Sequence, residues 1–177
     1  VQQLTASGIL AVSSNTGTIK IGETMSNDML HNYLTKFGIG IKTGSGLPGE
    51  SSGILRPVSD WSGTTAPTVA FGQGYSLTAM QATSVFATIA NNGVRVSPTV
   101  IAGTSDPSGH FTPAGNRSTT RVVSEDTAVK LRIMMESVVT ANGTAPSAAI
   151  PGYRVAGKTG TAMRYEDKPG RYSGYTA

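Results

Sequence analysis

The chain contains 177 residues, of which 38% are hydrophobic and 14% are charged, a balance that fits one globular domain with a core of its own. It has no cysteine, which excludes disulfide bonds, thiolate metal sites and cysteine nucleophiles. The net charge of +4 comes from basic residues spread along the chain without a run of Lys or Arg, which argues against nucleic acid as a partner.

The sequence also offers no good candidate residues for a metal site or for a Ser-His-Asp catalytic triad. The only histidines are His31 and His110, and no His, Asp and Glu residues cluster at the spacing of metal ligands. We therefore expect no metal, no cofactor and no Ser-His-Asp triad, so that serine chemistry would need a lysine base. The apolar runs are only a few residues long, and we expect no transmembrane helix or signal peptide within the chain, although an anchor could precede Val1.

The first part of the chain predicts two helices. Residues 1–21 contain a short helix that ends before Ser13-Ser14-Asn15. From Met25 to Phe37, apolar residues recur every three or four positions, which predicts an amphipathic helix that Gly38 ends.

The middle of the chain predicts a long loop and a buried helix. Residues 43–76 are rich in Gly, Ser, Thr and Pro, and Trp61 is expected to anchor this loop region in the core. Residues 77–92 are dense in apolar residues and predict a buried helix that Asn92-Gly93 closes.

Short strands and one more helix follow. Residues 94–101 and 119–123 predict strands, with a surface excursion at 102–117 between them. Ser124 is placed to cap a helix that begins with two acidic residues and runs to about Ala141.

The order of these elements favours an α+β fold, because helices and short strands alternate irregularly and no strand-helix-strand unit repeats. Residues 165–175 are polar, contain glycine and could form a hairpin loop. A partner strand is expected beyond Tyr175, so the domain looks truncated at this end.

The segment Tyr153–Ala162 is the strongest candidate for a site. It alternates apolar and polar residues in its first half, as a half-buried strand does, and then presents a lysine between glycines and hydroxyls. We interpret it as an active-site edge strand whose uncovered backbone, cation and hydroxyls suit a small carboxylate. The alternative is an exposed lysine on a solvated strand. The residues concerned are Gly157, Lys158, Thr159, Gly160 and Thr161.

The same tripeptide also occurs at Lys42-Thr43-Gly44, so the bare pattern cannot identify the site. This copy follows a glycine-broken segment and precedes Ser45-Gly46-Leu47-Pro48-Gly49, which is typical of turns. We expect Lys42 to be a surface loop lysine.

Three stretches in this order resemble the transpeptidase domain of penicillin-binding proteins: Ser13-Ser14-Asn15, Gly72-Gln73-Gly74 and Lys158-Thr159-Gly160-Thr161. Further stretches are similar to the class B type and most of all to the FtsI-like septal transpeptidases of actinobacteria. They are Gly46-Leu47-Pro48-Gly49-Glu50, Asn91-Asn92-Gly93-Val94 and Pro151-Gly152-Tyr153. The resemblance covers almost the whole chain.

One element of that family is missing from the sequence. Its Ser-x-x-Lys nucleophile has no match, and the nearest imitation, Thr127-Ala128-Val129-Lys130, lies on the wrong side of Ser13. The resemblance thus implies part of a serine β-lactamase-like domain, a helical subdomain with antiparallel strands, truncated at both ends. The anchor, pedestal and nucleophile would lie outside residues 1–177.

The resemblance implies a role for each matching residue. Ser13 would relay protons, Asn15 would hold the substrate amide and Lys158 would supply positive potential. Thr159 and Thr161 would bind the terminal carboxylate, and the Thr161 backbone N–H would form half of the oxyanion hole. Ser14 would be structural.

Binding would also use the open backbone. Gly160 would leave room for the ligand, which would lie antiparallel to the strand like an added strand, and this geometry would suit β-lactams as well as peptides.

The implied activity is peptidoglycan D,D-transpeptidation of D-Ala-D-Ala stem peptides through an acyl-serine intermediate, with inhibition by β-lactams. Two alternatives remain: a D,D-carboxypeptidase or serine β-lactamase, and a non-catalytic β-lactam sensor or binding module. The resemblance further implies an extracytoplasmic domain on the cell membrane. Its expected partners are a membrane glycosyltransferase, division or elongation proteins and the rest of its own chain.

Overall fold

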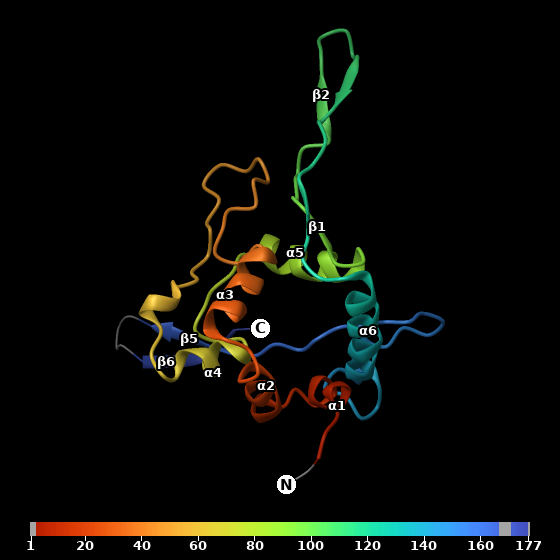
Figure 1. Cartoon of the computed structure of the whole chain (residues 1–177). Coiled ribbons are helices and arrows are strands. Elements are labelled where there is room, and N and C mark those ends of the chain that lie inside the picture. The colour runs from red at the N-terminus through yellow and green to blue at the C-terminus, as the bar shows by residue number, and fades with distance from the viewer. Residues whose placement is uncertain (1–2, 167–170, 177) are drawn as a thin grey trace. The chain divides into compact units, whose positions relative to one another are not determined.

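The computed structural model describes residues 3–166 and 171–176, and within it the chain divides into two compact units (Figure 1). The first unit comprises residues 1–25, 62–74 and 131–177, and the second comprises residues 26–61 and 75–130. Helices and short antiparallel strand pairs alternate irregularly, which confirms the predicted α+β class.

The first unit begins with two short helices in sequence. Helix α1 (Ala6–Ala11) is capped by the Thr5 hydroxyl, and helix α2 (Asn15–Gly22) is capped by the Ser14 hydroxyl. Helix α2 was not predicted, because it contains two glycines and only a weak apolar stripe. Its formation depends instead on tertiary packing against helix α4 (Thr65–Ala70).

The C-terminal half of helix α6 (Glu125–Glu136) belongs to the same unit and continues into the 3-10 turn η2 (Ser137–Val139). Turn η2 packs against α1 and against a second 3-10 turn, η3 (Pro146–Ala148). The core of this unit is small and aliphatic. Its buried members are Ala11, Val69, Met135, Val138 and Val139.

The prediction of a strand at Tyr153–Ala162 is wrong for most of its length. Residues 153–161 are extended but unpaired, because no other described segment forms a strand ladder with them. Strand β5 (Ala162–Glu166) starts at the end of the predicted segment and pairs antiparallel with β6 (Arg171–Thr176). The described part of the late polar stretch therefore contributes to two paired strands, and the partner strand lies at 171–176 and not beyond Tyr175 as expected.

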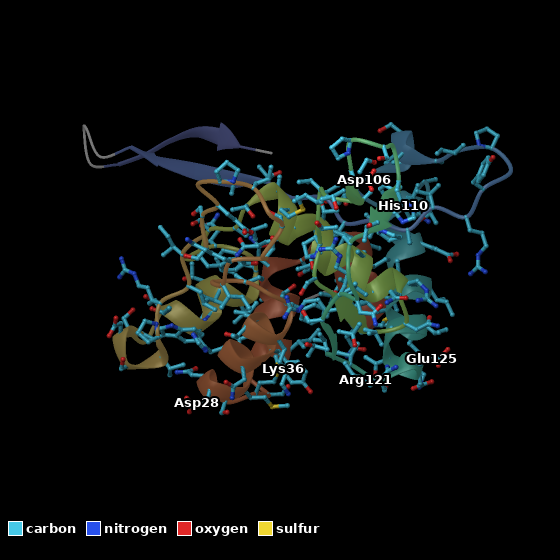
Figure 2. The ribbon with its side chains drawn as sticks, turned by 90° about the horizontal axis from the view of Figure 1, so that it is seen from above. Asp28, Lys36, Asp106, His110, Arg121 and Glu125 are labelled. Atoms are coloured by element: carbon cyan, nitrogen blue, oxygen red, sulfur yellow. The ribbon has the colours of Figure 1, made fainter. Side chains whose placement is uncertain are left out.

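The second unit contains the clearest predicted helix, α3 (Asn27–Lys36). Ser26 caps its N-terminus by accepting a hydrogen bond from the Met29 backbone N–H. Asp28 lies in the first turn, at the positive end of the helix dipole, and Lys36 lies in the last turn, at the negative end (Figure 2). Both charges therefore stabilise the helix.

Helix α5 (Ala79–Ala90) corrects the prediction of an apolar buried helix. Its buried residues include Gln81, Ser84 and Thr88, whereas Phe86 is 46% exposed. Gln81 completes a capping box with Thr78 at the helix start. The buried face is therefore largely polar, and its hydrogen bonds must be satisfied inside the unit.

Both predicted strands flanking the surface excursion are present. Strand β1 (Val94–Val96) pairs antiparallel with β4 (Thr119–Arg121), and β1 also packs against α5. The excursion itself is a hairpin of β2 (Gly103–Ser105) and β3 (Phe111–Pro113), which extends beyond the β1–β4 pair (Figure 1).

The start of α6 is tied to the strand pair. Ser124 caps α6 as predicted, by accepting from the Thr127 backbone N–H at 3.2 Å. The Arg121 guanidinium donates to the carbonyl of Asn92, whose side-chain amide donates to the carboxylate of Glu125. Figure 2 labels Arg121 and Glu125. The regular helix ends at Glu136, five residues before the predicted end, and η2 follows.

The loop region 43–76 is less irregular than predicted, since it contains α4 and the 3-10 turn η1 (Val58–Asp60). Trp61 does not anchor it in a core. Its ring is half-buried and meets the His31 ring of α3 edge-on at 6.1 Å between centroids, while its indole N–H donates to the carbonyl of Arg56. The indole thus fastens the loop to a helix surface.

None of the helices in the described part of the chain is long and apolar enough to cross a membrane.

Candidate active site

Ser13 occupies a strained position at the end of α1. Its φ of 53° lies in the left-handed region, which only two non-glycine residues of the described chain adopt. The turn is held by hydrogen bonds from the backbone N–H groups of Ser13 and Ser14 to the carbonyls of Leu10 and Ile9. Strain of this kind persists only where the surroundings enforce it, and it is commonly found at functional sites.

The two serines of this turn have different tasks. The Ser14 hydroxyl accepts a hydrogen bond from the Gly17 backbone N–H at 3.1 Å and caps α2, which agrees with its predicted structural role. Asn15 is the first residue of α2, and its side chain is exposed, without a hydrogen-bond partner among the described side chains. An exposed amide beside the Ser13 turn is available to a ligand.

Lys158 joins this turn to the extended segment. Its ammonium donates to the Ser13 hydroxyl oxygen at 2.6 Å and to the Thr159 carbonyl at 3.0 Å. The side chain is partly buried, and this burial lowers the pKa of Lys158 below the ordinary lysine value of 10.5. Two motifs 145 positions apart in the sequence are thus in direct contact.

The direction of this hydrogen bond decides what Ser13 can do. A hydroxyl has one proton to donate and two lone pairs to accept with, and an ammonium can only donate. Because the Ser13 oxygen accepts from Lys158, its own proton remains available for a further group. The pair can therefore pass a proton while the ammonium supplies positive potential.

Thr159 has a partner that the sequence did not reveal. Its hydroxyl lies 2.8 Å from the hydroxyl of Thr144, in the turn that precedes η3. On the other side of Lys158, the Gly157 backbone N–H donates to the Met135 carbonyl at 3.3 Å. Thr144 stands in a Gly-Thr-Ala turn that looks like an ordinary helix end, so no local signal marks it.

The remaining predicted residues line an open face. Gly160 and Thr161 are exposed, and the Thr161 side chain has no hydrogen-bond partner among the described side chains. A Cβ atom added at Gly157 or Gly160 would meet nothing within 4 Å. The protein itself therefore leaves space beside the backbone, as a ligand-binding edge requires.

The other Lys-Thr-Gly copy, at Lys42-Thr43-Gly44, has a different environment. Lys42 is exposed, as predicted, while the Thr43 and Gly44 backbone N–H groups donate to the two carboxylate oxygens of Glu50 at 2.6 and 3.1 Å. The Thr43 hydroxyl also donates to Glu50 and is the main cause of the lowered pKa of this carboxyl, which desolvation partly opposes. The Glu50 carboxylate thus already accepts hydrogen bonds from the backbone N–H groups of this copy.

At Lys158-Thr159-Gly160, by contrast, no carboxylate among the side chains that the structure describes takes the corresponding place. Thr43 and Gly44 of the earlier copy therefore bind a carboxylate of the chain itself, whereas the described side chains offer none to the later copy.

The chain matches a known family over its full length. Residues 1–177 match the model described as the penicillin binding protein transpeptidase domain. The chain is 41% identical over 178 positions to penicillin-binding protein PbpB of Mycobacterium tuberculosis, covering 97% of this chain and 26% of that protein. It is 36% identical to peptidoglycan D,D-transpeptidase FtsI of Escherichia coli, covering 99% of this chain and 29% of that protein.

Solved structures agree with the sequence comparison. The crystal structure of penicillin binding protein 3 of M. tuberculosis in complex with ampicillin superposes with a TM-score of 0.91 at 40% identity, covering 96% of this chain and 39% of that one. The chain spans between a quarter and a third of the curated relatives named above. With the family model matched from end to end, and with the fold shared, the chain belongs to the penicillin-binding protein transpeptidase family.

Proposed function

We propose that the protein containing this chain is a peptidoglycan D,D-transpeptidase that works through an acyl-serine intermediate. The observation that carries this proposal is the 2.6 Å hydrogen bond between Lys158 and Ser13, beside an open, glycine-lined backbone. The chain would supply the substrate-binding and proton-relay side of the site. The nucleophilic serine and its neighbouring lysine would come from a segment outside these 177 residues, since the sequence contains no Ser-x-x-Lys.

In the first half-reaction, the nucleophile oxygen would form a bond to the carbonyl carbon of the penultimate D-Ala of a stem peptide. The bond from that carbon to the nitrogen of the terminal D-Ala would break. The proton of the nucleophile would pass to its neighbouring lysine and from there to Ser13, as Ser13 delivers its own proton to the departing amine. Lys158 would meanwhile hold the Ser13 oxygen as an acceptor. Asn15, at the same turn, would hold the amide of the substrate.

In the second half-reaction, the amine of another stem peptide would attack the acyl-serine, and the relay would run in reverse. The amine would lose its proton through Ser13, and the nucleophile oxygen would regain one as it leaves. The Thr161 backbone N–H would stabilise the oxyanion of both tetrahedral intermediates, together with a second donor from the nucleophile segment. One such donor typically contributes about 3 kcal/mol to the transition state.

The terminal carboxylate of the stem peptide would lie against Lys158 and the hydroxyls of Thr159 and Thr161. The occupied copy at Thr43 and Gly44 supports the part of this assignment that concerns Thr159, because there the Thr43 hydroxyl, at the matching position, donates to the carboxylate of Glu50. A β-lactam carries a carboxylate at the corresponding place and would bind in the same way. Penicillin binding protein 3 of M. tuberculosis, which is similar to this chain, has been crystallised with ampicillin and with aztreonam.

Fluorescent penicillin tests the proposal directly. We expect the full-length protein to form a covalent adduct that survives denaturing electrophoresis, and the 177-residue chain alone to form none, because it lacks the nucleophile. Labelling of the isolated chain would contradict the assignment of its motifs, and a full-length protein that remains unlabelled would contradict the acyl-serine chemistry.

Product analysis separates the proposed function from its alternatives. A transpeptidase joins the acyl group to an amine acceptor, a carboxypeptidase or β-lactamase passes it to water, and a sensor holds it without turnover. We expect the full-length protein, given a D-Ala-D-Ala stem peptide and an amine acceptor, to yield cross-linked product. Hydrolysed product alone would favour the second class, and a stable adduct without product the third.

The proposed substrate implies where the protein acts and which proteins act beside it. Stem peptides are cross-linked outside the cytoplasmic membrane, so the domain would be extracytoplasmic and held at the membrane by a part of the protein outside this chain. There it would work beside a membrane glycosyltransferase and the proteins of cell division or elongation. Fluorescent penicillin should label it in the cell-envelope fraction, and recovery only from the cytosol would oppose this placement.

A further inference from the structure

The site has two walls, the helix end that presents Ser13 and the extended segment that presents Lys158. Both walls are attached to one short turn, Gly143-Thr144-Ala145. The Thr144 backbone N–H donates to the carbonyl of Ala11 at 3.1 Å, two residues before Ser13. The Thr144 hydroxyl lies 2.8 Å from the Thr159 hydroxyl, next to Lys158. A single residue therefore contacts both the helix that presents Ser13 and the segment that presents Lys158.

The turn itself is held firmly. The backbone N–H groups of Gly143 and Ala145 donate to the carbonyls of Thr140 and Val138 at 2.9 Å each. A Cβ atom at Gly143 would lie 2.1 Å from the Val138 carbonyl oxygen, so only glycine permits this approach. The backbone position of Thr144 is thus determined by η2, which lies in the buried core of the first unit.

The segment 153–161 needs such an attachment, because it has no strand partner among the described residues. Apart from the bond of Lys158 to Ser13, two attachments face the end of α6: Arg154 pairs with the Glu136 carboxylate at 2.7 Å, and the Gly157 N–H bonds to the Met135 carbonyl. Both lie before Lys158. Thr144 supplies the attachment on the other side, so the Lys158 backbone is held from both directions.

We propose that Thr144 is a positioning residue of the site: it fixes the spacing of Ser13 and Lys158 and orients the Thr159 hydroxyl toward the ligand carboxylate. This inference rests on the proposed function. A threonine hydroxyl has one proton, so Thr159 can donate to a carboxylate only if the Thr144–Thr159 hydrogen bond is donated by Thr144. Thr144 would then hold Thr159 in the correct rotamer with its proton free.

The test compares Thr144→Val with Thr144→Ser in the full-length protein. Valine matches threonine in shape and keeps the backbone bond to Ala11, but it removes the hydroxyl, whereas serine keeps it. We expect Thr144→Val to slow acylation by penicillin about tenfold, the equivalent of one lost hydrogen bond, and Thr144→Ser to stay within about twofold of wild type. The matched control is Thr140→Val, directly after η2, since the Thr140 hydroxyl donates only to the Ser137 carbonyl.

Two readouts separate positioning from a general loss of stability. In a Thr159→Val background, Thr144→Val should cause no further loss, because the proposed effect passes through the Thr159 hydroxyl. With a penicillin methyl ester, which has no carboxylate, Thr144→Val should cause a smaller loss than with penicillin, because only the effect on the spacing of Ser13 and Lys158 remains. A Thr140→Val variant that slows acylation equally, or a Thr144→Val loss that persists in the Thr159→Val background, would overturn the inference.

A third readout needs no acylation. In full-length protein labelled with ¹⁵N-lysine, Thr144→Val should move the Lys158 side-chain resonance and raise its pKa toward 10.5, because a looser segment exposes the ammonium. Thr140→Val should leave both unchanged. If penicillin does not label the wild-type protein, the proposed function fails, but the resonance measurement still decides whether Thr144 positions Lys158. A Lys158 resonance that is unchanged in Thr144→Val would contradict the positioning role of Thr144.

Discussion

We expect Lys158→Ala in the full-length protein to slow acylation by penicillin about a thousandfold, and Lys42→Ala to leave the rate within about twofold of wild type. Lys158 donates to the Ser13 oxygen and places a positive charge beside the open backbone. Its loss removes the electrostatic attraction for the carboxylate and the hydrogen bond that orients the relay. Lys42 is an exposed loop residue, and the donors that follow it are already bound to Glu50.

Stopped-flow measurement of acylation with a chromogenic β-lactam, alongside thermal unfolding of each variant, distinguishes a chemical effect from misfolding. Lys158→Ala should unfold close to the wild-type temperature, because it removes the burial cost of the ammonium together with its two hydrogen bonds, and these effects oppose each other. Loss of activity in Lys42→Ala with retention in Lys158→Ala would mean that the other tripeptide is the functional copy.

The pH dependence of the same rate gives an independent check on Lys158. Burial holds its pKa below 10.5, so the ammonium loses its proton at a lower pH in the folded protein than in the unfolded chain. Acylation should therefore fall as the pH rises through the folded pKa, and Lys158→Arg should show no such decline because arginine stays protonated. Between that pKa and 10.5 the unfolded chain binds more protons, so this residue makes stability rise with pH.

Gln81→Leu should destabilise the protein by about 4 kcal/mol, which is among the largest effects of a single substitution. Gln81 is fully buried, and its amide nitrogen donates to the carbonyls of Gly38, Ile41 and Ser52 at 2.8–3.2 Å. Its amide oxygen accepts from the Thr78 backbone N–H at 2.8 Å. Leucine fills a similar volume but leaves these buried and part-buried backbone groups without a partner.

Gln81→Glu and Thr83→Ala sharpen this test. Glutamate retains the acceptor for Thr78 but sets a carboxyl group against three carbonyl oxygens, so its loss should be comparable to that of leucine. Thr83 lies on the exposed side of the same helix and donates only to the Ala79 carbonyl, so Thr83→Ala should change stability by less than about 0.5 kcal/mol. Urea denaturation measures all three, and a Gln81→Leu loss as small as that of Thr83→Ala would contradict the role of Gln81.

Local signals accounted for the elements that depend on short-range chemistry. The N-cap at Ser124 and the amphipathic stripe of α3 arise from neighbours within a few residues, and these predictions are confirmed. The strands at 94–96 and 119–121 are confirmed as well, although they pair with each other and not with near neighbours in the sequence. Helix α2 was missed because packing against α4, rather than helix propensity, stabilises it.

Burial was harder to predict than secondary structure. Gln81 reads as a polar residue at a helix start, but the backbone carbonyls that surround it come from segments 29 to 43 positions away, which no window of sequence can show. Trp61 reads as a core residue, yet it rests on the ring of His31 because its indole N–H has an exposed carbonyl as partner. In both cases the position of distant backbone groups decided the outcome.

By itself, the sequence determined the family resemblance, the order of the Ser-x-Asn and Lys-Thr-Gly motifs, and the absence of a Ser-x-x-Lys nucleophile, because these depend only on residue identity. The tertiary structure decided which Lys-Thr-Gly copy is open, since the Glu50 carboxylate folds back onto the earlier one. It also brought Lys158 to Ser13 across 145 positions and placed Thr144 against both walls. Such contacts arise from packing the whole chain, and no local propensity encodes them.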